Sequence, residues 1–266
     1  MLSIILLVLS VLGTAGIYLG FPTVSAWWIL PIWLACYAGG IFCHFLLICV
    51  TSLFLSPSKQ IQKPNRFCRF MIPFTLDLVL KLFRVRVTVE GEEKLPDEPC
   101  VIVSNHLSNF DPLAMLVALR RRNIVYISKD ANFRLPLVGN YINNAGFISI
   151  DRNNGVRALR SLNVAADRMK ELGVDVGVYP EGTRSKSGEL LRFKTGAFRL
   201  AKDANAPLVV MTTRGTGNVS HNFPLRRTRV ALKVHEVISA AEVASLTAEE
   251  LCARTRGIVE KEFEEA

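Results

Sequence analysis

The chain has 266 residues, a formal net charge of +9 and a mean hydropathy of +0.29, which is high for a soluble protein. The basic balance suits an anionic membrane or an anionic substrate, and it argues against nucleic acid because no recognition motif accompanies the charge. The six cysteines form no C-x-x-C pair, which disfavours both a zinc site and a disulfide framework.

Two apolar runs open the chain, Ser3–Phe21 and Trp27–Leu55, and no Lys, Arg, Asp or Glu precedes Lys59. Each run is long enough to cross a hydrocarbon core of about 30 Å. Residues 1–57 are therefore predicted to form a membrane-anchoring helical hairpin.

The second apolar run is interrupted by Pro31 and by Gly39-Gly40. A hairpin that enters only one leaflet is an alternative. A signal peptide is a further alternative for the first run, although that run lacks a basic start. Either hairpin returns the chain to its starting side, and the excess of Lys and Arg after Ser56 places the remaining residues in the cytoplasm.

Basic residues follow the hairpin at once. From Ser56 to Glu90 there are seven Lys or Arg residues and two acids. This pattern is typical of a segment that lies against anionic head groups, with a plain solvated face as the alternative. Residues 58–84 are predicted to form an amphipathic basic connector, lying in the interface or packed on the domain, with a break near Pro73.

Residues 85–266 alternate strand-like and helix-like segments, which predicts one α/β domain with a largely parallel sheet flanked by helices. The predicted strands are Val85–Glu90, Cys100–Ser104, Ile124–Ser128, Phe147–Ile150, Val174–Tyr179, Pro207–Thr212 and Val230–His235. The predicted helices are Pro112–Arg122, Gly155–Leu172, Thr195–Ala204 and Thr247–Glu265. Polar motifs follow several of these strands, at the carboxyl ends where α/β sheets bind ligands.

His106 and Asp111 lie five residues apart, directly after the strand Cys100–Ser104. One continuous helix would hold them apart, whereas a strand-to-helix turn can bring them together. Asp111-Pro112 is typical of a helix start, with Asp as N-cap and Pro at the first position. A neutral imidazole oriented by a carboxylate can remove the proton of an attacking hydroxyl. Purely structural roles for both residues are the alternative.

Cations follow other predicted strands. Arg184 lies in the segment Tyr179 to Ser185, Lys194 comes just before a predicted helix, and Arg152 ends another strand. Helix N-termini and arginine side chains both bind anions, so these residues predict a phosphate clamp. Ordinary surface charge is the alternative. Glu181 is expected either to pair with one of these cations or to bind a substrate hydroxyl.

Four short motifs occur in order: Asn105 to Asp111 (N-H-x-x-x-x-D), Gly146 to Arg152 (G-x-x-x-I-D-R), Glu181 to Arg184 (E-G-T-R) and a proline-centred strand at Ala206 to Val210. Over roughly residues 85 to 235 the chain thereby resembles the glycerolipid acyltransferase family, specifically its bacterial-type 1-acyl-sn-glycerol-3-phosphate acyltransferases.

The resemblance implies an enzyme that moves a fatty acyl group from acyl-CoA or acyl-acyl carrier protein to the sn-2 hydroxyl of 1-acyl-sn-glycerol-3-phosphate, giving phosphatidate. No metal or prosthetic group is expected, and the expected location is a bacterial plasma membrane. His106 and Asp111 would form the catalytic dyad. The glycerol phosphate end of the acceptor would be bound by Arg152, Glu181, Gly182, Thr183, Arg184 and Lys194.

Three rival functions remain open at this point. The same fold could acylate glycerol 3-phosphate or another lysophospholipid. A thioester hydrolase is a second possibility, although the sequence has no G-x-S-x-G motif. A membrane-bound scaffold without enzyme activity is the third.

Overall fold

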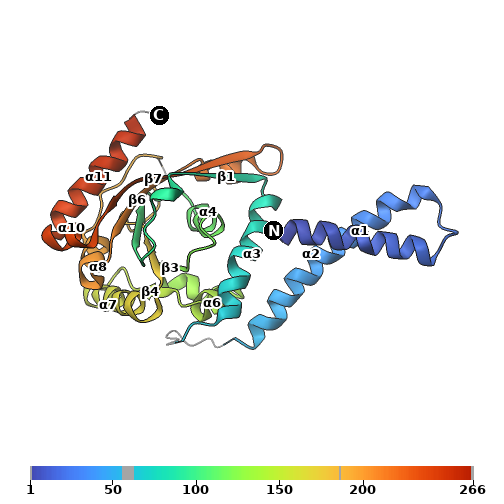
Figure 1. Ribbon diagram of the computed structural model, residues 1–266, viewed down its shortest axis with the longest axis horizontal. Helices are drawn as coiled ribbons and strands as arrows, with labels where there is room; N and C mark the ends of the chain where they lie inside the picture. The colour runs from blue at the N-terminus through green and yellow to red at the C-terminus, as the bar shows by residue number, and fades with distance from the viewer. Residues whose placement is uncertain (1, 56–62, 186, 265–266) are drawn as a thin grey trace.

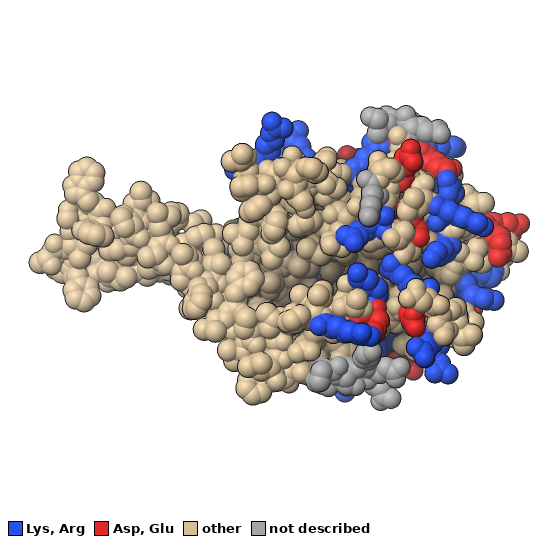
Figure 2. All heavy atoms as spheres, turned by 180° about the vertical axis from the view of Figure 1, so that it is seen from behind, with Lys and Arg blue, Asp and Glu red and all other residues tan. Residues whose placement is uncertain are grey.

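The computed structural model describes residues 2–55, 63–185 and 187–264, and it places a helical hairpin beside an α/β domain (Figure 1). Residues 56–62, which include the start of the predicted connector, lie outside the described residues. On the face seen in Figure 2, the hairpin and the half of the domain next to it show few charged side chains, whereas acidic and basic side chains crowd the opposite end.

The hairpin consists of α1 (Leu2–Gly20) and α2 (Ile29–Leu53). Both helices are long and apolar enough to cross a membrane, and most of their side chains are exposed, unlike those of a buried core helix. The helix α2 is continuous through Pro31 and Gly39-Gly40. Pro31 falls in the first turn, where a missing N–H costs little. A Cβ atom at Gly40 would lie 3.1 Å from Leu6, so this glycine allows α1 to pack closely.

The connector forms α3 (Arg66–Leu82), which continues through Pro73 without the predicted break. It contacts both the hairpin and the domain. Leu78 is buried in a small apolar cluster with Leu2 and Leu6 of α1. One face of α3 is therefore packed against the hairpin and the domain, as expected for a packed helix. Contact of its other face with the membrane interface stays a prediction.

Polar contacts also join the hairpin to the domain side of the molecule. His44 of α2 lies 3.1 Å from the hydroxyl of Thr75 on α3, and Lys81 of α3 donates to the Ser3 hydroxyl. On the other side, Asn140 of α6 (Val138–Asn144) donates to the backbone and side-chain oxygens of Ser52. The hairpin is thus fixed to the domain at two places.

Seven strands form one sheet in the order β1-β7-β6-β2-β5-β3-β4. All neighbouring strands are parallel except β6 and β7, which are antiparallel. The predicted largely parallel sheet is confirmed. The strands are β1 (Val85–Glu90), β2 (Val101–Ser104), β3 (Ile124–Lys129), β4 (Ile148–Ile150), β5 (Asp175–Val178), β6 (Leu208–Arg214) and β7 (Thr228–Ile238).

Helices cover both faces of the sheet, as predicted. On one face α4 packs with α3, and on the other face α7, α8 and α11 pack together (Figure 1). The helices after α3 are α4 (Phe110–Ala118), α5 (Asp130–Phe133), α6, α7 (Gly155–Leu172), α8 (Gly196–Ala204), α9 (Val219–Asn222), α10 (Ala240–Ser245) and α11 (Ala248–Glu264). Since β2, β3, β4, β5 and β6 run in one direction, their carboxyl ends share one edge, and the predicted site residues follow these ends.

Candidate active site

The turn after β2 brings His106 and Asp111 together, with 2.7 Å between Nδ1 of the imidazole and Oδ2 of the carboxylate. Asp111 is fully buried, whereas 13% of the His106 side chain is exposed. A carboxylate has no proton to donate, so Nδ1 carries the hydrogen of this bond and Nε2 keeps its lone pair. The arrangement leaves Nε2 able to accept a proton from a bound hydroxyl.

Asp111 is not the helix cap that the sequence predicts. Asn109 occupies the N-cap position, and Asp111 lies inside the first turn of α4. Its Oδ2 atom points back toward the preceding turn and accepts the backbone N–H groups of Leu107 and Ser108 at 2.7 and 2.8 Å. The carboxylate therefore shapes the loop that carries His106 as well as orienting its ring.

The other oxygen of Asp111 accepts the hydroxyl of Thr216, which is fully buried in the connection after β6. Sequence reasoning missed Thr216. It lies 105 residues further along the chain and reaches the dyad only because β6 is the neighbour of β2 in the sheet. With this bond, both carboxylate oxygens have donors and the carboxylate has a fixed orientation.

Glu181 holds the backbone of His106. Its Oε1 atom accepts the His106 N–H at 2.6 Å and its Oε2 atom accepts the Leu191 N–H at 3.1 Å. Among the described residues no Lys or Arg pairs with this carboxylate, and binding of a substrate hydroxyl by Glu181 stays a prediction. The Ser185 N–H donates to the His106 carbonyl at 2.8 Å, so the Glu181–Ser185 segment braces His106 from both sides. Burial raises the pKa of the Glu181 carboxyl.

Two tyrosines continue the support behind the imidazole. The Tyr179 ring stacks on His106 with 4.1 Å between centroids and 12° between planes, and Tyr126 stacks on Tyr179 at 5.5 Å. A Cβ atom at Gly177 would lie 2.4 Å from the Tyr126 ring, so only glycine leaves room for this stack. Burial raises the pKa of both phenols, which keeps them neutral. The local sequence predicts both tyrosines only as strand residues.

The predicted phosphate-binding residues gather around the turn after β5. Arg152 donates to the Gly182 carbonyl, and a Cβ atom at Gly182 would lie 2.9 Å from the Lys194 ammonium. Gly182 has a φ of +69°, a conformation that suits glycine. Arg184 and Thr183 are exposed, and no ion pair or hydrogen bond of the Arg184 side chain occurs among the described residues. The same segment thus carries free positive charge and braces His106.

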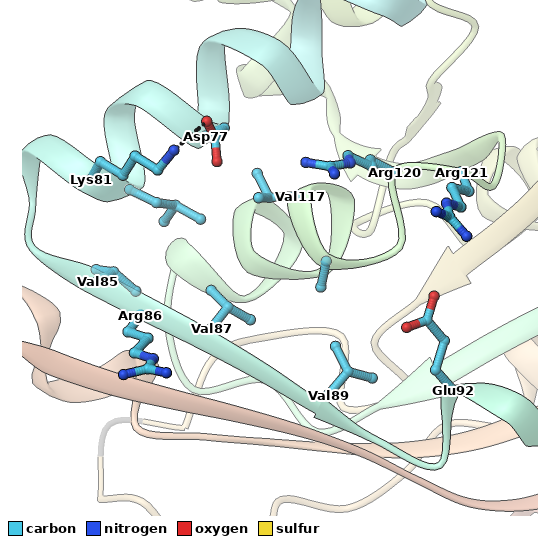
Figure 3. A pocket seen from close by; sticks show the side chains of 12 residues that line it. Asp77, Lys81, Val85, Arg86, Val87, Val89, Glu92, Val117, Arg120 and Arg121 are labelled. Atoms are coloured by element: carbon cyan, nitrogen blue, oxygen red, sulfur yellow. Dashed lines mark hydrogen bonds and ion pairs between the residues drawn. The ribbon is translucent and has the colours of Figure 1, made fainter. Parts of the chain in front are cut away.

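A separate groove of about 580 Å³ lies between α3, β1 and α4 (Figure 3). Val85, Val87 and Val89 point into it, and Arg120 and Arg121 stand at its rim. None of the predicted site residues lines this groove. The neighbouring Arg122 instead makes a two-pronged ion pair with Asp175 at 2.6 and 2.7 Å, which is a structural role.

Known acyltransferases are similar to this chain in sequence and in fold. A family model described as Acyltransferase matches residues 86–214. The chain is 33% identical over 179 residues to a 1-acyl-sn-glycerol-3-phosphate acyltransferase of Chlamydomonas reinhardtii, covering 65% of this chain and 52% of the relative. It is 39% identical over 129 residues to the human 1-acyl-sn-glycerol-3-phosphate acyltransferase alpha, covering 48% and 45%. The chain thus spans about half the length of these curated relatives.

Among solved structures, the chain is similar to the 1-acyl-sn-glycerophosphate (LPA) acyltransferase PlsC from Thermotoga maritima. The TM-score is 0.58 and the identity is 26%, and the alignment covers 82% of this chain and 86% of that one. The similarity therefore extends beyond residues 86–214 to most of the chain.

Proposed function

Because this chain belongs to the glycerolipid acyltransferase family, we propose that it acylates the sn-2 hydroxyl of 1-acyl-sn-glycerol-3-phosphate and forms phosphatidate. The observation that carries the proposal is the His106–Asp111 pair, with a proton-accepting nitrogen at the carboxyl edge of β2. The acyl donor is acyl-CoA or acyl-acyl carrier protein, and the proposal includes no metal or prosthetic group.

The reaction is a direct transfer without an acyl-enzyme. Nε2 of His106 removes the hydroxyl proton as the oxygen attacks the thioester carbonyl. The C–S bond then breaks, and the imidazolium returns the proton to the leaving thiolate. Asp111 stabilises the positive ring during this step, because it accepts the Nδ1 hydrogen and is itself fully buried.

The acceptor phosphate binds at the turn after β5. Arg184 and Lys194 supply positive charge that solvent can reach, and Arg152 lies against Gly182 of the same turn. Glu181 contributes indirectly, since it connects this turn to the backbone of His106. Thr183 supplies a hydroxyl donor beside these cations. Acceptor binding and base positioning thus depend on one short segment.

The proposed location is a membrane. The two exposed apolar helices α1 and α2 enter the bilayer, and the α/β domain lies on the cytoplasmic side of a bacterial plasma membrane. Lysophosphatidate reaches the site by lateral diffusion in the adjoining leaflet.

A transfer assay tests the proposal. The purified full chain is reconstituted in vesicles and given both donors with lysophosphatidate, glycerol 3-phosphate or lysophosphatidylcholine. Phosphatidate that forms only with lysophosphatidate, and that disappears in His106→Ala, is the expected result. Release of free fatty acid at the same rate with and without acceptor would instead identify a thioester hydrolase.

A further inference from the structure

A second surface, distinct from the dyad and the phosphate turn, combines positive charge with exposed apolar side chains. We call it the arginine edge. It is formed where β1 and β7 begin and by the connection that precedes β7. Its members are Leu82, Arg84, Arg86, Phe223, Leu225, Arg226, Arg227 and Arg229.

We propose that the arginine edge is a second membrane contact, in which the arginines bind the phosphates of anionic phospholipids and Leu225 enters the acyl region. Leu225 is 84% exposed and Phe223 is 42% exposed. An apolar tip flanked by arginines is the composition that binds an anionic interface.

The charge of the arginine edge is not neutralised by the protein. The sequence contains no Asp or Glu from residue 204 to residue 235. Among the described residues, none of the five arginines forms an ion pair with a carboxylate; Arg84 donates instead to the backbone oxygen of Pro224. Arg86 and Arg229 occupy paired positions of neighbouring strands, so two like charges stand side by side. Such a pair is unfavourable until an anion binds between or beside its members.

The position of the arginine edge favours a bilayer over an acidic protein. Leu82 is the last residue of α3, whose neighbour Lys81 contacts Ser3 of the hairpin. Figure 1 shows the starts of β1 and β7 at the end of the domain from which the hairpin leaves. In the view from behind, basic side chains stand on this otherwise uncharged half of the domain (Figure 2). The arginine edge therefore continues the surface that the hairpin brings to the membrane.

Ring contacts connect this surface to the dyad. Phe223 packs on Phe83 with 4.6 Å between centroids, and Phe83 packs on Phe110 at 5.2 Å, beside Asp111. The connection that ends in Leu225 begins at Thr216, which binds Asp111. Membrane contact here would place the carboxyl edge of β2 at the level of the lipid head groups, where an anionic acceptor resides.

The test uses the full chain in vesicles and does not require catalysis, so its failure is distinguishable from failure of the proposed reaction. Trp27, Trp28 and Trp33 are replaced by Phe, and Leu225→Trp is introduced as the reporter. Val156→Trp is the matched control, because Val156 is 80% exposed on α7, away from the hairpin. Vesicles contain brominated phosphatidylcholine alone or with phosphatidylglycerol.

We expect blue-shifted emission and strong bromine quenching for Leu225→Trp, larger with phosphatidylglycerol, and neither effect for Val156→Trp. In the Leu225→Trp background, we expect the triple variant Arg226→Gln, Arg227→Gln and Arg229→Gln to lose the dependence on phosphatidylglycerol. Each substitution should lower the partitioning of the introduced tryptophan into vesicles that contain phosphatidylglycerol by roughly fivefold. The matched substitutions Arg160→Gln, Lys170→Gln and Lys261→Gln should leave this dependence unchanged. If brominated lipid leaves the emission of Leu225→Trp unchanged, the proposal is wrong. A loss of activity with acyl carrier protein in the arginine variants, together with this unchanged emission, would indicate that the arginine edge binds the carrier protein and not the membrane.

Discussion

The dyad and the cation cluster lie on one edge of the sheet but differ in construction. His106 and Asp111 are held by donors and acceptors on every side, and Asp111 is fully buried. Arg184 and Lys194 are exposed, and neither side chain forms an ion pair among the described residues. The proposed base is thus held in place by the protein alone, whereas the cations keep their charge available for an anion. Disturbing the first region should affect kcat, and disturbing the second should affect KM.

The largest effect is expected for His106→Ala. Loss of the general base should lower kcat by about 10²- to 10⁴-fold, and vesicle association should be unchanged because the hairpin does not depend on the dyad. Initial rates of phosphatidate formation and vesicle flotation measure the two properties. Near-normal turnover would exclude His106 as the base.

Asp111→Asn should come next, with a loss of several hundredfold in kcat. An amide can donate as well as accept, so it no longer fixes the Nδ1–H tautomer of His106. Thr216→Val serves as the graded comparison, since it removes one donor to the same carboxylate and should cost roughly tenfold. Equal losses in the two variants would show that Asp111 acts only through packing.

Arg184→Ala should raise the KM for lysophosphatidate by roughly tenfold with little change in kcat, as expected for one charge-assisted hydrogen bond at an exposed site. Arg157→Ala is the control, because Arg157 is an exposed cation that pairs with Asp151. Kinetics over a range of acceptor mole fraction separate the two constants. A kcat effect without a KM effect would contradict the assigned role.

Tyr179→Leu should lower kcat by about threefold to tenfold, because the stacked ring stabilises the imidazolium that forms during the reaction. Tyr179→Phe keeps the ring and should keep kcat. Initial rates at saturating acceptor measure kcat for both variants, and an equal loss in Tyr179→Phe would contradict a role for the ring.

The smallest effect concerns Glu181 and pH. Burial raises the pKa of this carboxyl above its usual 4.5, so the folded state binds the proton more tightly than the unfolded state. Stability contributed by Glu181 therefore falls as pH rises from about 4.5 through the raised value, and is constant above it. The difference in unfolding midpoint between the parent and Glu181→Gln should shrink over this window. A difference that grows with pH would contradict the direction.

The sequence predicts the parts of the molecule that depend on local patterns. The alternation of apolar and polar segments locates all seven strands, and the bounds of α7 agree with prediction at Gly155 and Leu172. The break expected near Pro73 is wrong, because packing on the hairpin supports α3. Propensity alone does not include that packing.

The supports of the site were less predictable for the same reason. The order of strands in the sheet decides that Thr216 reaches Asp111, and no local pattern contains that information. The stack on His106 needs a glycine at position 177, because any larger side chain would clash with the Tyr126 ring. This contact joins residues that are far apart in the sequence, so no local pattern predicts it. Motif spacing predicts His106 and Asp111 as the reacting groups, whereas only the tertiary structure shows which residues hold them in place.

The attachment of the hairpin to the domain has a mechanical consequence. The contacts at Thr75, Ser3 and Ser52 come from two sides of the α1–α2 pair, so in the proposed membrane-bound state the height of the domain above the bilayer is coupled to the position of the hairpin. The length of the hairpin then sets how far the active site lies from the centre of the bilayer. In bilayers of different hydrophobic thickness the catalytic nitrogen would stand at a different level from the acceptor alcohols, and turnover would depend on acyl-chain length of the host lipid even when the substrate is unchanged.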